Sequence, residues 1–117
     1  MVRNINVSGA QLGGPYVYLK RGDSFDLDIN FEYKGKPQNA TFQLDMRQGL
    51  YGTKYSCGSK TGAIAAATVW EARTAKFSFV VPSGVKDGSQ DLQLHITAAD
   101  GEHDESSWLT DCIWISV

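Results

Sequence analysis

The chain contains two histidines, and neither has the neighbours that catalysis or metal binding requires. No cysteine, serine or second histidine lies at a recognisable spacing from His95 or His103. His95 alternates with Leu94 and Ile96, which places it on the solvent side of a strand, while His103 falls in a hairpin loop. We therefore predict no catalytic residue, no metal site and no cofactor, and hence a protein that is not an enzyme.

Acidic residues crowd the segment from Asp100 to Asp111, and their spacing imitates a calcium-binding loop. The imitation fails at two positions. Glu105 stands where the sharp bend needs glycine, and the last ligand is an aspartate rather than the longer glutamate. A solvated acidic hairpin is the favoured interpretation, with a weak calcium site as the alternative.

Aromatic side chains form the remaining set with possible binding chemistry. In an all-β domain they serve most often as core or interface anchors, and when exposed they can also stack on sugar rings. The candidate contacts for a partner or ligand are Tyr51, Tyr55, Trp70 and Trp108.

The composition describes one ordinary globular domain. At 117 residues the chain can bury roughly two-thirds of its unfolded surface. Thirteen acids against 11 bases leave no basic surplus for nucleic acid. No run of 18 apolar residues and no signal-peptide pattern occurs, so we expect no membrane partner and synthesis in a cytoplasm.

The strongest strand signal lies in residues 21–35, where large apolar residues alternate with polar ones. This period of two buries one face of a strand and leaves the other in solvent, as in antiparallel sheets. The apolar row is Phe25, Leu27, Ile29, Phe31 and Tyr33. On the opposite face Asp26, Asp28 and Glu32 form an acidic row, which we interpret as protection against aggregation, with an ionic docking face as the alternative.

Further strands are predicted by the same alternation, at residues 2–7, 16–20, 41–47, 76–81, 91–98 and 108–117. We expect residues 41–47 to pair antiparallel with the strand of 21–35, which would bring Asp45 and Arg47 beside the acidic row. Asp100 and Gly101 predict a hairpin turn.

Three segments have weaker patterns. Residues 48–62 are rich in glycine and predict a long loop with a short strand near 54–57, and such loops often carry binding surfaces. Residues 63–72 fit either a helix or, preferably, a strand that pairs with 75–81. Residues 85–90 suggest a single helical turn.

These patterns together predict an antiparallel β-sandwich of roughly seven or eight strands. We divide the chain into an N-terminal arm or first strand, residues 1–14, and a sandwich domain, residues 15–117. Cys57 and Cys112 are expected to be reduced and buried, because 56 residues precede Cys57 and it cannot lie on the second strand of an antibody-type domain.

Turn and strand residues from Leu19 to Val117 resemble small immunoglobulin-like modules of tailed-bacteriophage virions. The resemblance is carried by residues 20–25 (KRGDSF), 33–37 (YKGKP), 46–47 (MR), 87–96 (DGSQDLQLHI), 100–101 (DG) and 113–117 (IWISV). It implies an immunoglobulin-like sandwich without catalytic residues.

The resemblance also implies a virion structural protein, made in the host cytoplasm, which decorates a capsid or forms part of a tail, collar or fibre. Its partners would be capsid or tail subunits, and it would be a homo-oligomer within the particle. The alternative is a carbohydrate-binding sandwich for adhesion, with Tyr51, Tyr55 and exposed tryptophans stacking on sugars.

Overall fold

The computed structural model describes residues 1–8, 17–49, 51–106 and 108–116 of the chain. These residues form strands and connections, with no helix and therefore none able to cross a membrane. The strands are β1 (Val2–Ser8), β2 (Val17–Lys20), β3 (Ser24–Gly35), β4 (Gln38–Arg47), β5 (Tyr55–Ile64), β6 (Ala67–Val80), β7 (Gly88–Ala98), β8 (His103–Glu105) and β9 (Leu109–Ser116).

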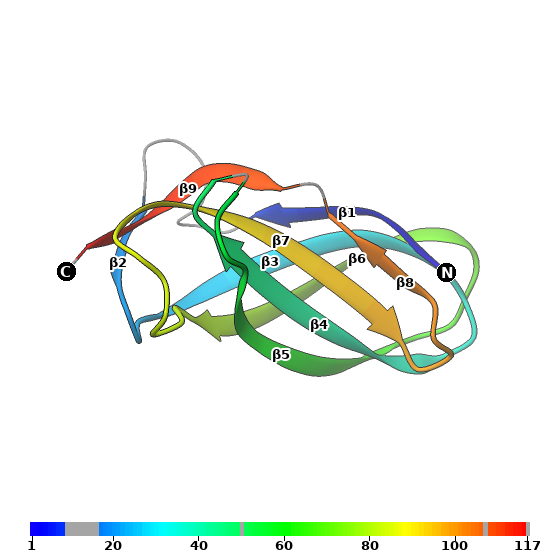
Figure 1. Cartoon of the computed structure of the whole chain (residues 1–117). Coiled ribbons are helices and arrows are strands. Elements are labelled where there is room, and N and C mark those ends of the chain that lie inside the picture. The colour runs from blue at the N-terminus through cyan, green and yellow to red at the C-terminus, as the bar shows by residue number, and fades with distance from the viewer. Residues whose placement is uncertain (9–16, 50, 107, 117) are drawn as a thin grey trace.

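The strands make two sheets that pack face to face (Figure 1). The first sheet has the order β1-β3-β6, and the second has the order β2-β9-β7-β4-β5, with β8 added beside β7. All neighbours are antiparallel except β2 and β9, which run parallel. The prediction of an all-β sandwich is confirmed, although the described part of the chain contains nine strands rather than seven or eight.

The core lies between the sheets and is built from the alternating rows that the sequence predicts. The apolar row of β3 is almost fully buried, and so are Phe42, Leu44 and Met46 of β4. The ring of Phe42 lies 4.9 Å from that of Phe77 and 5.9 Å from that of Phe31, measured between centroids, so it contacts two strands of the facing sheet. Close packing across this layer is what holds the two sheets together.

The predicted pairing of residues 41–47 with the strand of 21–35 is wrong, because β3 and β4 belong to different sheets. Only Lys36 and Pro37 separate them, and Gly35 has a φ of 151°, a region that side chains disfavour. The hydroxyl of Tyr33 donates to the carbonyl of Lys36 and accepts from Gln38 Nε2 at 2.8 Å. The chain therefore turns out of the plane of the first sheet and enters the second as an arch.

A second arch lies beside the first. Residues 65 and 66 connect β5 to β6, and the register places Ala67 opposite Gly35 and Ile64 opposite Gln38. Residues 63–64 and 67–72 lie in strands, as preferred over a helix, but they do not form a hairpin with 75–81. Instead β6 continues unbroken from Ala67 to Val80 and pairs with β3.

Two loop predictions also need correction. The loop after β4 covers only residues 48–54, because β5 already begins at Tyr55 and is held by pairing with β4. Residues 85–90 form no helical turn: β7 begins at Gly88. The turn at Asp100 and Gly101, which joins β7 to β8, is confirmed.

Candidate functional site

Two of the predicted contact residues, Tyr51 and Tyr55, lie at a hollow beside the β4–β5 loop. Tyr51 belongs to the loop and is 97% exposed, whereas Tyr55 opens β5 and is half-buried. The hollow has a volume of about 170 Å³. Its lining residues are Gln48, Tyr51, Gly52, Thr53, Tyr55, Lys86 and Gln90. The site therefore brings together two phenol rings, two side-chain amides and one ammonium group.

Amide side chains fix the walls of this hollow. Gln48 Nε2 donates to the carbonyl of Asp87 at 2.7 Å, and Gln90 Nε2 donates to the carbonyl of Lys86 at 2.8 Å. The first bond joins the β4–β5 loop to the β6–β7 connection, and the second holds that connection against the start of β7. These bonds hold the hollow in shape without a ligand, and ligand sites are usually preformed in this way.

Trp108 lies at the same end of the molecule, where β4 enters the loop. The guanidinium carbon of Arg47 is 3.7 Å from the centroid of a Trp108 ring, and Lys54 Nζ is 5.7 Å from it. Such cation–π contacts favour a fixed ring orientation. The Nε atom of Arg47 is buried and finds no hydrogen-bond partner within the described part of the chain. We call Tyr51, Tyr55, Trp108, Arg47 and Lys54 the aromatic–basic end.

Trp70 is separate from the aromatic–basic end, because it lies on β6 in the other sheet. The Arg3 guanidinium is 3.9 Å from its ring centroid and also donates to Glu32 at 3.0 Å. Asn4 Nδ2 donates to the same carboxylate at 2.6 Å. The hydrogen bonds from Asn4 and Arg3 lower the pKa of Glu32. The structure therefore brings three of the four candidate contacts together and places the fourth elsewhere.

The acidic row on β3 is occupied by contacts within its own sheet. Ser78 Oγ donates to Asp26, and Lys76 Nζ lies 3.7 Å from Asp28 Oδ1. Both partners come from the directly opposite positions of β6. Asp45 and Arg47, expected beside this row, instead lie on β4 in the other sheet.

His95 has partners that the sequence did not reveal. Its Nε2 lies 3.0 Å from Asp45 Oδ2 on β4, and its Nδ1 lies 3.2 Å from Glu105 Oε2 on β8. The register places Glu105 of β8 directly opposite His95, and Asp45 of β4 two positions from the residue opposite it. His95 is half-buried and faces away from the core, as predicted, and it connects three strands of the second sheet.

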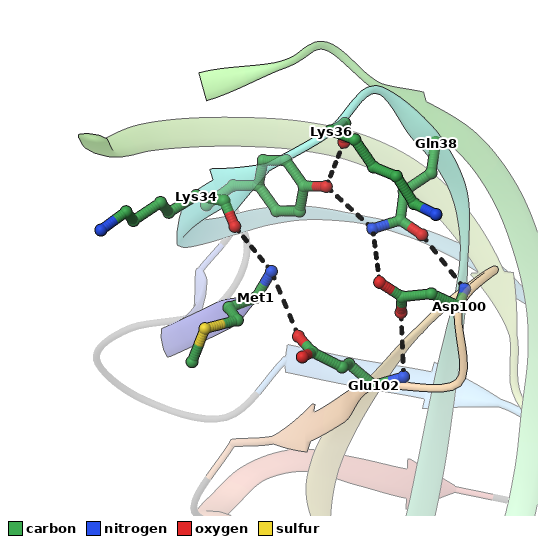
Figure 2. A network of polar contacts seen from close by, with 7 residues as sticks. Met1, Lys34, Lys36, Gln38, Asp100 and Glu102 are labelled. Atoms are coloured by element: carbon green, nitrogen blue, oxygen red, sulfur yellow. Dashed lines mark hydrogen bonds and ion pairs between the residues drawn. The ribbon is translucent and has the colours of Figure 1, made fainter. Parts of the chain in front are cut away.

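The acidic hairpin ties the second sheet to the first (Figure 2). The carboxylate of Asp100 accepts from the backbone N–H of Glu102 at 3.0 Å and from Gln38 Nε2 at 3.2 Å. The Glu102 carboxylate lies 3.2 Å from the amine nitrogen of Met1, which also donates to the carbonyl of Lys34 at 2.7 Å. The contacts give these acids a structural role. Within residues 1–8, 17–49, 51–106 and 108–116, no group of three His, Cys, Asp or Glu side chains could hold a metal ion.

Cys57 is buried and free, as expected, while the side chain of Cys112 lies outside what the structure describes. Burial raises the pKa of the Cys57 thiol to about 12, and the nearby charge of Asp45 adds to the effect. A thiol with such a pKa is not a nucleophile at neutral pH.

Sequence reasoning missed the polar lining of the hollow. Lys86 lies in the β6–β7 connection and Gln90 at the start of β7, more than 30 residues beyond the loop, and nothing in their spacing to Tyr51 indicates that they meet. For Arg47 the sequence indicates only a charge on a strand. The register of β4 with β7, which sets it opposite Asp91, was not available from alternation alone.

The fold and this site define a two-sheet β-sandwich with an exposed aromatic and basic surface at one end. No protein-family model and no curated protein matches the sequence. Among solved structures, the sporulation control protein Spo0M from Bacillus subtilis is similar in fold, with a TM-score of 0.59 at 12% sequence identity. The match covers 99% of this chain and 49% of the Spo0M chain, so this chain spans about half the length of that protein. At this identity the likeness concerns the fold alone.

Proposed function

We propose that the chain is a non-enzymatic structural protein that binds other protein subunits through its aromatic–basic end. The observation that carries the proposal is Tyr51, a large aromatic side chain that is 97% exposed in the loop that follows Arg47, whose guanidinium stacks on Trp108. Tyrosine, tryptophan and arginine are the residues most enriched at the energetic centres of protein interfaces. Tyr51 contributes nothing to the core, and its place at the hollow is the reason that we assign it to a partner contact.

The setting that we propose is a bacteriophage particle, with capsid or tail subunits as the partners. This part of the proposal is supported by the turn and strand residues that resemble virion modules. On the same support we propose that the sandwich is of the immunoglobulin-like type. In such a module the rigid sheets hold the binding end in place, and affinity comes from buried aromatic surface.

Cosedimentation with isolated capsids and with isolated tails tests this proposal. Tyr51→Ala should weaken binding to one of the two by about tenfold or more, the usual effect of removing a central aromatic anchor. Tyr18→Ala is the matched control, because Tyr18 is an exposed tyrosine on β2. Equal binding by the unmodified chain and Tyr51→Ala would show that the aromatic–basic end does not bind the partner. If the unmodified chain binds neither particle, the virion setting is excluded.

A second function, carbohydrate binding in adhesion, is favoured by the hollow itself. Tyr51 and Tyr55 offer aromatic faces, while Gln48 and Lys86 offer polar groups at a site of suitable form for one sugar ring. A glycan array followed by titration of each hit should show binding that Tyr51→Ala and Lys86→Ala both weaken. An array without hits would exclude this second function while leaving subunit binding intact.

A further inference from the structure

In the described part of the chain the two strand orders end at four edge strands, and three of these carry features that prevent pairing with another strand. The β1 edge has a register break and a residue, Asn4, with a φ of 55°. The β2 edge has only four residues, and the β5 edge is broken by a bulge next to Gly58, which has a φ of 115°. Bulges and short edges are the usual protections against edge-to-edge association.

The β6 edge lacks these protections over most of its length. From Glu71 to Val80 its register with β3 is continuous, with neither glycine nor proline, and its irregularity is confined to the part before Glu71. The one basic side chain on its outer face, Lys76, is engaged by Asp28. A long, regular edge of this kind is a template for another strand.

Backbone geometry shows which groups of β6 point toward this edge rather than toward β3. Val81 donates its N–H to the carbonyl of Asp23 at 2.9 Å and accepts from Gly22 at 3.0 Å. Along an antiparallel pair such residues alternate, so odd-numbered residues of β6 direct their N–H and C=O toward β3. The even-numbered residues, Thr74 and Lys76 among them, direct theirs to the open edge.

We propose that β6 pairs antiparallel with β6 of a second copy of this chain, about a two-fold axis at Ala75, so that two three-stranded sheets become one of six strands. A two-fold axis at a residue keeps core-facing positions on the core side, whereas an axis between residues would exchange the faces. Only axes at Ala75 or Lys76 pair nine residues inside the regular stretch from 71 to 80.

Charge decides between these two registers. An axis at Lys76 sets two lysines directly opposite each other, which is unfavourable across strands. An axis at Ala75 sets two small side chains opposite each other and pairs Lys76 with Thr74 of the second copy. Just beyond these nine residues, the same register brings Val80, which is 47% exposed, toward the part of the second copy that holds Trp70. Because of the two-fold axis this contact occurs twice, so Trp70 of each copy gains Val80 of the other copy as an apolar neighbour.

This pairing deepens the proposed function, since it names the partner through which a structural subunit forms homo-oligomers. It concerns a different surface from the aromatic–basic end. The purified chain alone can therefore test it, so its failure leaves the proposed binding to other subunits untouched.

Sedimentation equilibrium of the chain and of two Thr74 variants is the first test. Both Thr74→Lys and Thr74→Glu remove the hydrogen bond from Thr74 to Asn30, so they are matched for effects on the free chain. Opposite Lys76 of the second copy, Thr74→Lys should weaken the dimer by about tenfold, and Thr74→Glu should tighten it. A chain that remains monomeric up to about 1 mM, or two variants that shift the dissociation constant equally, would overturn the proposal.

Oxidative cross-linking then tests the register, in a Cys112→Ala background that leaves only the buried Cys57. Residues facing each other at a two-fold axis lie about 4.5–5.5 Å apart between Cα atoms, within reach of a disulfide. Ala75→Cys should therefore form a covalent dimer. In this register Ser78 of one copy lies six residue positions from Ser78 of the other, so Ser78→Cys should remain monomeric. Cross-linking of Ser78→Cys in place of Ala75→Cys would refute this register.

Discussion

Cys57 illustrates how burial sets the chemistry of a single side chain. Its thiol lies on the inner side of β5, where a thiolate would lose the hydration that stabilises its charge. The charge of Asp45 disfavours the thiolate further, so the pKa rises from 9.0 to about 12. The expectation of a free, buried thiol is confirmed at Cys57.

The first prediction concerns the reactivity of this thiol. In a Cys112→Ala chain, Cys57 should not react with a thiol reagent at pH 8 while the protein is folded, because the thiolate is the nucleophile. It should react fully once urea unfolds the chain. Rapid modification of the folded protein would show that the site opens to solvent far more readily than its burial indicates.

The same shift predicts how stability depends on alkaline pH. The folded chain keeps the Cys57 proton at pH values where the unfolded chain releases it, so the free energy of unfolding falls as pH rises from about 9 toward 12. The slope contributed by this group approaches about 1.4 kcal/mol per pH unit. Urea unfolding of the Cys112→Ala chain at pH 8 and at higher pH should show it, whereas Cys57→Ala in the same background should lose less stability over that range.

At the scale of elements, the β4–β5 loop is shaped by a close contact of its own backbone. A Cβ atom on Gly52 would lie 2.3 Å from the carbonyl oxygen of Gln48, which no side chain can accept without movement. Gly49 in the same loop has a φ of 72° but has open space around it. The two glycines thus serve different purposes.

This difference predicts the effect of alanine at each position. Gly52→Ala should displace the loop and with it Tyr51, because the clash is with backbone atoms. Gly49→Ala should cost about 1 kcal/mol of stability from its left-handed conformation while leaving the hollow intact. Amide chemical shifts of the residues lining the hollow distinguish the two variants. Equal shift changes at Lys86 and Gln90 in both variants would contradict the different purposes assigned to the two glycines.

The central strand of the second sheet, β7, is the element on which most pairing depends. It contacts β4, β8 and β9, and Leu94 at its middle is fully buried. Leu94→Ala should lower the free energy of unfolding by about 2–5 kcal/mol, through lost burial and the cavity left behind. Thr97→Ala, at an exposed position on the same strand, should change it by less than about 0.5 kcal/mol. Urea unfolding measures both.

At the scale of the whole molecule, Asp100 holds the hairpin whose Glu102 forms an ion pair with the Met1 amine, and this pair links the two sheets in addition to the core and the connections that cross between them. The backbone N–H of Glu102 is the main cause of the lowered pKa of Asp100, and the Gln38 amide and the Lys36 charge lower it further. A group whose pKa is lowered by folding stabilises the fold above its unfolded pKa. That contribution is lost as pH falls through the folded value.

Asp100→Asn should therefore reduce thermal stability at pH 7 and make little difference near pH 2. The melting temperatures of the two proteins should converge as the medium is acidified. Lys34→Asn, which alters a nearby exposed side chain but not the bonds of Asp100, should change the melting temperature equally at both pH values. Parallel melting curves for Asp100→Asn and the unmodified chain would show that the carboxylate is unimportant to the link.

The sequence by itself determined which residues of each strand are buried. Rows such as Phe25 to Tyr33 in β3 and Leu92 to Ile96 in β7 follow from the period of two, a property of the local backbone, and the structure buries them as predicted. The turn at Asp100 is local in the same sense.

Tertiary structure alone decided which strands share a sheet. The alternation in residues 41–47 fits a strand beside β3 in the same sheet and equally a strand in the opposite sheet. The arch at Gly35 places the strand in the opposite sheet. The same choice separates Trp70 from Trp108 and brings Lys86 and Gln90 to Tyr51. Periodicity records the face that each strand buries, but sheet membership depends on contacts between residues far apart in the chain, and no local pattern contains them.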